Sequence, residues 1–463
     1  MSHMTGRSNS IDPPAYSPAE NWKKSPHAAL ISDFGTHPGI LKIRGHPARP
    51  NFLYLSDEPG YYTIYRWDPD TQEGAKVLLD EEPVADSASS GDFMLHPYHP
   101  WIVYSKTSQG ERAHSLYLLN YETGRVRRLV DAIGTVEFLL PYNGESLIAV
   151  VTTQEHIQLA AISYEGDTRT LFTTDQQILS IAASEGQRVV AIAVGRATTE
   201  ILIIDAHSGT VARRFSEAEN SKEGSLTIES ESGYLAYTTN AKGEGEEIVI
   251  RSIETMKEID RIAVPGSIGF FDLNYLEWVN ERELLAVVAQ DGRVAPRLLN
   301  TADAAWSAPL TPTSAIYLTN TSQGILWVAS DFACPEFVQG YRVGKIETVI
   351  PPSFENHSLM VESHWYQSFD GRQIQGWLMR NAEHPQARLI VMCHGGPTAA
   401  AKNEWGEPIV QLLVQAGYHV FQPNFRGSTT FGTEFMNLQM GDVGGGDLQV
   451  VLHGANHIIE LLD

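Results

Sequence analysis

The sequence predicts a seven-bladed β-propeller followed by a layered unit in which strands alternate with helices. Three observations support this prediction. A strand–turn pattern recurs seven times between residues 41 and 352, at the spacing of propeller blades. Pro351 and Pro352 then end the repeat, and strands begin to alternate with helical segments. Finally, a short apolar strand runs directly into a glycine-bearing turn at residues 394–397.

The composition is that of a folded protein with a sizeable core. The 463 residues are 42% hydrophobic and 19% charged, which excludes wholesale disorder and coiled coil. The net charge of −23 makes nucleic acid and acidic membranes unexpected partners. We interpret the acidic excess as an aid to solubility, the alternative being a preference for cationic substrates. Only two cysteines occur, Cys334 and Cys393, so we expect free thiols and a cytoplasmic location.

Residues 1–40 are rich in proline and serine and show weak patterning. We expect an N-terminal arm that packs on another part of the protein. The first four residues, MSHM, resemble a cloning remnant.

The blades are predicted from two independent series of strands. In the first series a polar turn precedes an apolar strand, with the copies FLYLS, WIVYS, LIAVV, VVAIAV, YLAYT, LLAVVA and ILWVAS. In the second series a strand precedes a turn, with the copies IYRWDPDTQE, LYLLNYETGR, LAAISYEGDT, ILIIDAHSGT, IVIRSIETMK, RLLNTADAA and QGYRVGKIE. Both series repeat roughly every 40–50 residues, which is typical of four-stranded propeller blades. Such small sheets bury one another when they stack radially. An array of β-sandwiches is the alternative.

The elements after Pro352 follow α/β order. Two strands flank the turn at Asp370 and Gly371, which suits a tight hairpin. Residues 389–393 form a continuous apolar run, typical of a strand buried on both faces. A helix follows that carries Ile409, Leu412, Leu413 and Ala416 at helical spacing and ends at Gly417. A strand at residues 418–422 comes next.

The last predicted helix begins near Asp447 as its N-cap. We expect it to bury its apolar residues, which are Leu448, Val451, Leu452, Ala455, Ile458, Ile459 and Leu462.

The turn HGGP carries the main chemical signal. Acyl transfer builds negative charge on a carbonyl oxygen, and main-chain N–H groups held at a strand-to-helix turn can stabilise that charge. Glycines let the main chain approach closely. An isolated HGG is more often a plain tight turn, but the strand before it and the helix after it favour an oxyanion-binding loop.

Residues 389–447 resemble the catalytic domain of the prolyl oligopeptidase family of serine peptidases, most closely its acylaminoacyl-peptidase branch. The matching segments are LIVMCHGGP, AGYHVFQPNFRGSTTFGTEF and GDVGGGD. That branch carries HGGP, NYRGSTGYG and GD-x-GG-x-D in the same order. Phe425 and Phe431 stand here where tyrosine is usual, and Val443 where tryptophan is common. The resemblance implies a seven-bladed β-propeller at residues 41–352 and the N-terminal part of an α/β-hydrolase domain at residues 353–463.

The resemblance also implies roles for single residues. Gly396, with Gly395 beside it, would form the oxyanion-hole loop. Asn424, Arg426 and Ser428 would brace the loop near the domain interface, the alternative being simple loop-closing hydrogen bonds.

The family's nucleophile, acid and histidine follow in a later segment, in the order Ser, Asp, His. We therefore expect the triad to lie outside this chain, which alone should be inactive. The strand at residue 389 would then present an open edge. We expect a separate C-terminal hydrolase fragment to complete the sheet. The alternatives are a truncation that keeps only the propeller, and completion by another copy of the chain.

The sequence thus predicts a serine-type peptidase that hydrolyses short peptides through an acyl-enzyme, with a non-catalytic propeller scaffold as the alternative. We expect no cofactor and no metal. His453 and His457 have the spacing of a zinc motif, but Gly454 stands where the glutamate belongs.

Overall fold

The computed structural model describes residues 39–462 except residues 59–61, 78–91, 108–112, 185, 196, 244, 269–274, 382, 384–387, 397–398 and 406–407. The predicted N-terminal arm, residues 1–40, therefore lies almost entirely outside the described residues.

Antiparallel sheets account for the chain up to residue 350. The first contains β1 (Ile40–Arg44), β2 (Phe52–Ser56), β3 (Thr63–Asp68) and β4 (Glu73–Lys76). A seven-stranded sheet follows, with β5 (Phe93–Leu95), β6 (Trp101–Thr107), β7 (His114–Asn120), β8 (Arg125–Pro141), β9 (Ser146–Thr152), β10 (Ile157–Ser163) and β11 (Thr168–Thr174). The next sheet contains β12 (Ile178–Ser184), β13 (Val189–Gly195), β14 (Thr199–Asp205) and β15 (Val211–Phe215).

Three further four-stranded sheets complete this part of the chain. They are β16 (Glu223–Glu229), β17 (Tyr234–Thr239), β18 (Glu247–Ser252) and β19 (Glu258–Ala263); β20 (Leu276–Asn280), β21 (Glu283–Gln290), β22 (Arg293–Asn300) and β23 (Ala305–Trp306); and β24 (Ile316–Thr321), β25 (Gly324–Asp331), β26 (Cys334–Arg342) and β27 (Lys345–Ile350).

The long strand β8 belongs to two groups of strands. Its first half, from Arg125, pairs with β7, whereas its second half, from Thr135, pairs with β9. Between the halves, Ala132 and Gly134 have φ angles of 44° and 128°, and this left-handed backbone turns the strand. Dividing β8 at this bend leaves four strands on each side. The two repeated series of the sequence supply the second and third strands of every group, from β2 and β3 to β25 and β26.

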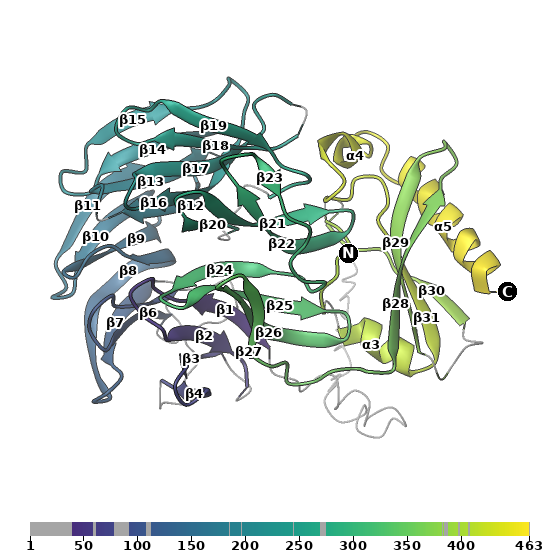
Figure 1. Ribbon diagram of the computed structural model, residues 1–463, viewed down its shortest axis with the longest axis horizontal. Helices are drawn as coiled ribbons and strands as arrows, with labels where there is room; N and C mark the ends of the chain where they lie inside the picture. The colour runs from purple at the N-terminus through teal and green to yellow at the C-terminus, as the bar shows by residue number, and fades with distance from the viewer. Residues whose placement is uncertain are drawn as a thin grey trace, which may run out of the picture.

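The sheets are held together in a closed ring. Within the described residues, each successive pair of groups shares a cluster of buried apolar side chains. A further cluster joins the last group to the first, with Leu326, Val328 and Val338 packed against Phe52 and Trp67. The ring therefore closes by apolar packing rather than by a shared strand. Figure 1 shows these sheets gathered on one side of the molecule.

The remaining residues form a three-layered unit beside the ring (Figure 1). Its sheet has the order β28-β29-β31-β30, and β30 and β31 are its parallel pair. The elements are β28 (Leu359–Gln367), β29 (Gln373–Asn381), β30 (Arg388–Val391), α3 (Pro408–Gln415), β31 (Tyr418–Pro423), α4 (Thr433–Asn437) and α5 (Gly446–Leu462). Side chains alternate along β29, so Trp377 and Met379 pack with α3, and Ile374 and Leu378 pack with α5. The predicted hairpin turn is confirmed, with Gly371 at φ 85°.

The buried stripe of α5 differs from the predicted one. Val450, Gly454 and Ile458 are buried, whereas Leu448, Leu452 and Ile459 are 46–49% exposed. An alanine-sized side chain at Gly454 would lie 2.6 Å from the Tyr366 ring, so only glycine lets the helix approach the sheet on this face. The helix also begins one residue early. Asp447 lies in its first turn, and Asp442 accepts the Gly446 N–H at 2.9 Å.

Two other sequence predictions for this unit were wrong in detail. Val410 and Val414 form the buried face of α3, and Ile409 is 43% exposed. The strand β30 ends at Val391 and is only half-buried, because it lies at the edge of the sheet and has β31 as its one neighbour among the described strands. The pairing of β30 with the strand at Tyr418 is as expected.

The ring and the layered unit share a polar and aromatic interface. The Phe332 and Trp377 rings lie 5.0 Å apart, and the Arg293 guanidinium lies 4.9 Å from the centroid of Trp377. Asn403 accepts the Val294 N–H at 2.9 Å and donates to the Pro312 carbonyl at 2.8 Å.

Candidate active-site loop

The turn that carries Gly395 and Gly396 lies at the carboxyl end of β30. Met392 still donates to the Phe421 carbonyl at 2.9 Å, after which the chain leaves the sheet. Parallel strands end at the same edge, so this turn lies beside the loop that follows β31. Both glycines are exposed, and Gly396 has a φ of 79°, a left-handed conformation that favours glycine. A Cβ atom on Gly395 would meet no heavy atom within 4 Å.

His394 connects the two loops, and the sequence analysis gave it no role. Its Nε2 lies 2.7 Å from the Ser428 hydroxyl, and its ring stacks on Phe425 with centroids 4.4 Å apart. Burial lowers the pKa of His394 below its usual 6.5, which favours the neutral ring. The Ser428 hydroxyl donates to the Phe425 carbonyl at 2.6 Å, and Nδ1 of His394 lies 3.1 Å from the Gly395 carbonyl, so the ring connects Ser428 to the glycine turn through both nitrogens.

The predicted bracing residues occupy distinct positions. Asn424 is fully buried; its Oδ1 accepts the Ala401 N–H at 2.8 Å, and its Nδ2 donates to Gln375 Oε1 at 2.6 Å and to the Ala401 carbonyl at 3.0 Å. Ser428 holds His394, as described above. Arg426 instead forms an ion pair with Asp370, and its guanidinium lies 4.7 Å from the centroid of Phe369. Asn424 and Ser428 therefore contact the segments around the glycine turn, whereas Arg426 contacts the β28–β29 hairpin.

Thr430 is a further residue that the sequence analysis missed. Its φ of 74° is uncommon for a β-branched side chain and costs roughly 1–3 kcal/mol. Its carbonyl accepts the Asp291 N–H at 3.1 Å, and its hydroxyl accepts the Gly292 N–H at 3.0 Å. The signal was present in the sequence, because the resembling motif NYRGSTGYG has glycine at this position.

The cysteines do not form a disulfide. Cys334 is buried and Cys393, directly before His394, is exposed. Burial and the nearby Asp331 raise the pKa of Cys334, and partial loss of solvent around the sulfur and the nearby Asp447 raise the pKa of Cys393, so both favour the thiol form.

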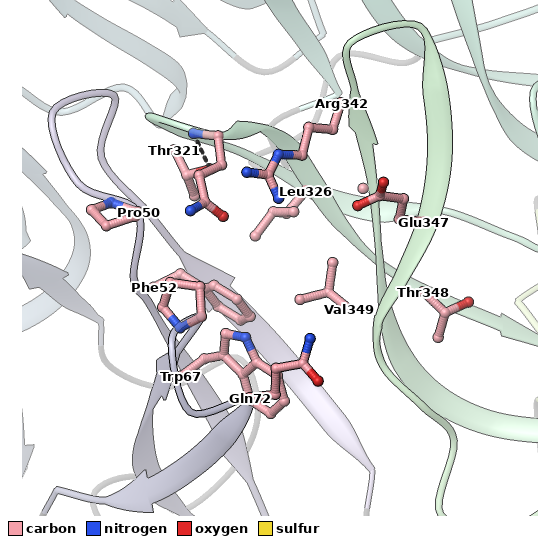
Figure 2. Close-up of a pocket in the computed structure, with 13 residues that line it drawn as sticks. Pro50, Phe52, Trp67, Gln72, Thr321, Leu326, Arg342, Glu347, Thr348 and Val349 are labelled. Carbon is pink, nitrogen blue, oxygen red and sulfur yellow. Dashed lines mark hydrogen bonds between the residues drawn. The ribbon is translucent and has the colours of Figure 1, made fainter.

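A separate cavity of about 270 Å³ lies where the ring closes. Its lining comes from the first and last sheets of the ring and from no residue of the layered unit. Figure 2 shows Phe52 and Trp67 on one side, with Arg342 and Glu347 across from them. This cavity is therefore not part of the loop described above.

Neither a membrane-spanning helix nor a metal-binding cluster occurs among the described residues. None of their helices is both long and apolar enough to cross a membrane. Nor do they contain a group of three or more His, Cys, Asp or Glu side chains that could hold a metal ion.

No protein-family model matches this chain. Among curated proteins, the uncharacterized peptidase YuxL of Bacillus subtilis (strain 168) is 34% identical over 108 residues, which are 22% of this chain and 16% of that protein. The human acylamino-acid-releasing enzyme is 27% identical over 143 residues, 30% of this chain and 18% of the enzyme. Dipeptidyl peptidase family member 6 of Caenorhabditis elegans is 43% identical over 58 residues, 12% of this chain and 8% of that protein. The chain thus matches less than a fifth of the length of each relative.

Solved structures match over a much larger share of the chain. A puromycin hydrolase superposes with a TM-score of 0.75 at 16% identity, covering 94% of this chain and 73% of its own. A prolyl endopeptidase superposes with a TM-score of 0.69 at 15% identity, covering 95% and 68%. An acylaminoacyl peptidase gives 0.67 at 13% identity, covering 93% and 72%. The chain therefore has the fold of structures from the prolyl oligopeptidase and acylaminoacyl peptidase family, and the curated relatives that it matches carry peptidase names.

Proposed function

We propose that this chain is the front portion of a serine-type peptidase that hydrolyses short peptides, in the manner of an acylaminoacyl peptidase or an oligopeptidase. The observation that carries the proposal is the His394–Gly395–Gly396 turn at the carboxyl end of β30, beside the loop after β31. Peptidase-named relatives and peptidase folds support the same reading.

Two domains follow from this proposal. Residues 41–352 form a seven-bladed β-propeller, which limits access to short or unfolded peptides. The division of β8 into two halves and the apolar clusters that close the ring support this blade count. Residues 353–463 form the N-terminal portion of an α/β-hydrolase domain.

The proposed reaction proceeds through an acyl-enzyme. A serine oxygen attacks the peptide carbonyl carbon, and a histidine takes the serine proton and passes it to the departing amine. Water then hydrolyses the ester. In both steps the carbonyl oxygen gains negative charge, which the main chain at Gly396, with Gly395 beside it, stabilises. The nucleophile, the acid and the histidine come from a segment outside these 463 residues.

A second polypeptide, carrying that segment, completes the sheet. The edge strand β30 offers it an unoccupied ladder among the described strands, and the apolar side chains of α5 offer an adjoining surface. Leu448, Leu452 and Ile459 are each close to half exposed. Burying the exposed halves of these side chains would contribute roughly 2–4 kcal/mol to the association.

A fluorophosphonate probe tests this proposal on the chain purified under native conditions from cells that make it. We expect the probe to label a second polypeptide of about 20–30 kDa, scaled from a whole hydrolase domain, that co-purifies with this chain. Intact mass spectrometry identifies that polypeptide.

A pair of matched variants tests the docking surface. Leu452→Asp should reduce recovery of the labelled polypeptide. Ile259→Asp, at a residue of the ring with nearly the same exposure (47% against 48%), should not. A well-folded sample without any labelled polypeptide would contradict the proposal and favour a non-catalytic propeller scaffold. Association of the chain only with its own copies would contradict the second polypeptide.

A further inference from the structure

The tip of the β21–β22 hairpin bonds to a single residue of the layered unit. The adjacent N–H groups of Asp291 and Gly292 donate to the carbonyl and to the hydroxyl of Thr430, at 3.1 Å and 3.0 Å. In Figure 1 this hairpin points from the ring toward the loops beside β29 and α4. Gly292 is buried with a φ of 73°, and a Cβ atom there would lie 2.6 Å from Gln375 Oε1. The tip of the hairpin therefore packs closely against the layered unit at Gln375, with no room for a side chain at residue 292.

Thr430 has a strained backbone conformation. A β-branched residue rarely has a φ near 74°, because its side chain crowds the main chain. Such a conformation persists where surrounding contacts over-determine it, and it often marks a functional position. Two hydrogen bonds from the hairpin reach this residue, so the ring helps to hold Thr430 in this conformation.

Thr430 continues directly into the supports of the glycine turn. Its neighbour Thr429 donates to the Ala399 carbonyl at 2.9 Å, just past the turn. The next residue back, Ser428, is hydrogen-bonded through its hydroxyl to Nε2 of His394, which immediately precedes Gly395. The chain on both sides of Gly395 and Gly396 is thus attached to the short segment that ends at Thr430.

A second contact links the same regions. Asn403 accepts the Val294 N–H and donates to the Pro312 carbonyl, so it joins the hairpin to the chain that follows the glycine turn. Asn403 is 3% exposed, which shields both hydrogen bonds from water. The hairpin therefore contacts the loop system at two points.

We propose that Thr430 is a positioning residue, through which the β21–β22 hairpin of the ring fixes the geometry of the Gly395–Gly396 turn. The functional meaning of this contact between the hairpin and Thr430 rests on the proposed oxyanion role of the turn. A displacement of the hairpin moves Thr430, and the hydrogen bonds of Thr429 and Ser428 carry that displacement to Ala399 and His394. The ring is thereby coupled to the candidate catalytic loop.

Hydrogen exchange of the full chain, followed by mass spectrometry, tests the coupling without substrate. Thr430→Val preserves the shape and the β-branching and removes only the hydroxyl acceptor. We expect amide exchange to accelerate at least threefold in peptides covering residues 399–401 and 429, as well as at Gly292. Thr430→Ser keeps the hydroxyl and should restore slow exchange. Asn300→Ala, which removes one side-chain hydrogen bond to Ala302 within the ring, is the matched control and should change neither peptide.

The outcomes separate the alternatives. Acceleration confined to Gly292, with residues 399–401 and 429 unchanged, would overturn the proposal, because the contact would then be purely local. Thr430→Val is used only if it lowers the melting temperature of the whole chain by less than about 10 °C. If the loss is larger, Asn403→Ala is measured instead. Faster amide exchange at residues 399–401 and 429 in that variant would support the proposal, and unchanged exchange there would contradict it. This experiment measures no activity, so unchanged exchange at residues 399–401 and 429 would contradict only the positioning role of Thr430. The proposed peptidase function is tested separately by fluorophosphonate labelling.

Discussion

Replacing Asn424 by alanine should destabilise the layered unit by about 3 kcal/mol. The side chain is fully buried and makes three hydrogen bonds, two to the Ala401 main chain and one to Gln375. Truncation leaves the Ala401 N–H and Gln375 Oε1 without these partners, while the Ala401 carbonyl still accepts from Trp377 at 3.1 Å. Each orphaned buried group costs about 1–3 kcal/mol, and two of them give the total above.

Equilibrium unfolding in urea measures this loss, with the intrinsic tryptophan fluorescence, to which Trp377 of the layered unit contributes, as the probe. Asn300→Ala is the control, because its residue lies at the surface of the ring and its loss should stay below about 1 kcal/mol. A loss below about 1 kcal/mol for Asn424→Ala would refute the argument, since the three hydrogen bonds would then contribute little.

Asn424→Asp sharpens the same test. Aspartate preserves the shape and the acceptor for Ala401 but loses both donors, and it places a charge beside two oxygen atoms. Burial and these oxygens raise the pKa of the introduced carboxyl in the folded state, so the folded state binds the proton more tightly than the unfolded state. The stability of this variant relative to the parent chain should therefore increase as the pH falls from 7 to 5. A relative stability that decreases on acidification would contradict this account.

Four further predictions concern other residues. Gly454→Ala should destabilise by about 1–3 kcal/mol in urea, although alanine is the better helix former, because its Cβ would lie 2.6 Å from the Tyr366 ring; a gain in stability would show that the ring moves freely. Burial and the nearby His99 lower the pKa of His96 to about 4, so only the unfolded state gains the proton between pH 6.5 and 4, and stability falls through that window. In His96→Asn the amide oxygen can replace Nδ1 as the hydrogen-bond acceptor. The free energy of unfolding, measured in urea, should therefore fall by about 2 kcal/mol less between pH 7 and pH 4.5 in this variant than in the parent chain. An equal fall in both proteins would contradict this prediction. Gly395→Ala should change the melting temperature by less than about 2 °C, because its Cβ meets open space, so any change in fluorophosphonate labelling would report on the turn itself. Asp92→Asn should cost about 3 kcal/mol, because the buried Lys42 and the partly exposed Arg44 would lose this buried carboxylate, and a neutral result in urea would mean that water replaces it.

The strands of the ring were predictable because of how they are buried. The second and third strands of each group lie inside their sheets and pack against neighbouring sheets, so they read as apolar runs such as those of β13 and β25. The fourth strands, such as the half-exposed β15, carry more polar residues and left no comparable signal. The seven-bladed count stays a prediction, since β8 passes through two groups of strands.

The candidate site was predictable only in part. The glycine turn could be found because a buried-strand pattern, two glycines and a following helix lie together in the sequence. The positions of Gly395 and Gly396 at the end of β30 are as expected, and their oxyanion role stays a prediction. The contacts of His394 and Thr430 were missed because their partners Ser428 and Gly292 lie 34 and 138 residues away in the chain. No local pattern reports such distant pairs.

By itself, the sequence determined the two apolar strands at the middle of each group, the main strands and helices of the layered unit, and where the repeat gives way to α/β order, because burial on both faces and turn chemistry are recorded locally. Only the tertiary structure decided which apolar stripe of α5 is buried, since Leu452 and Val450 are equally apolar and the glycine at position 454 selects the face that can approach the sheet. It also decided that the hairpin of the ring meets Thr430. The physical reason is the same in both cases: close approach and hydrogen bonding depend on which surfaces meet, and that is a property of the assembled fold.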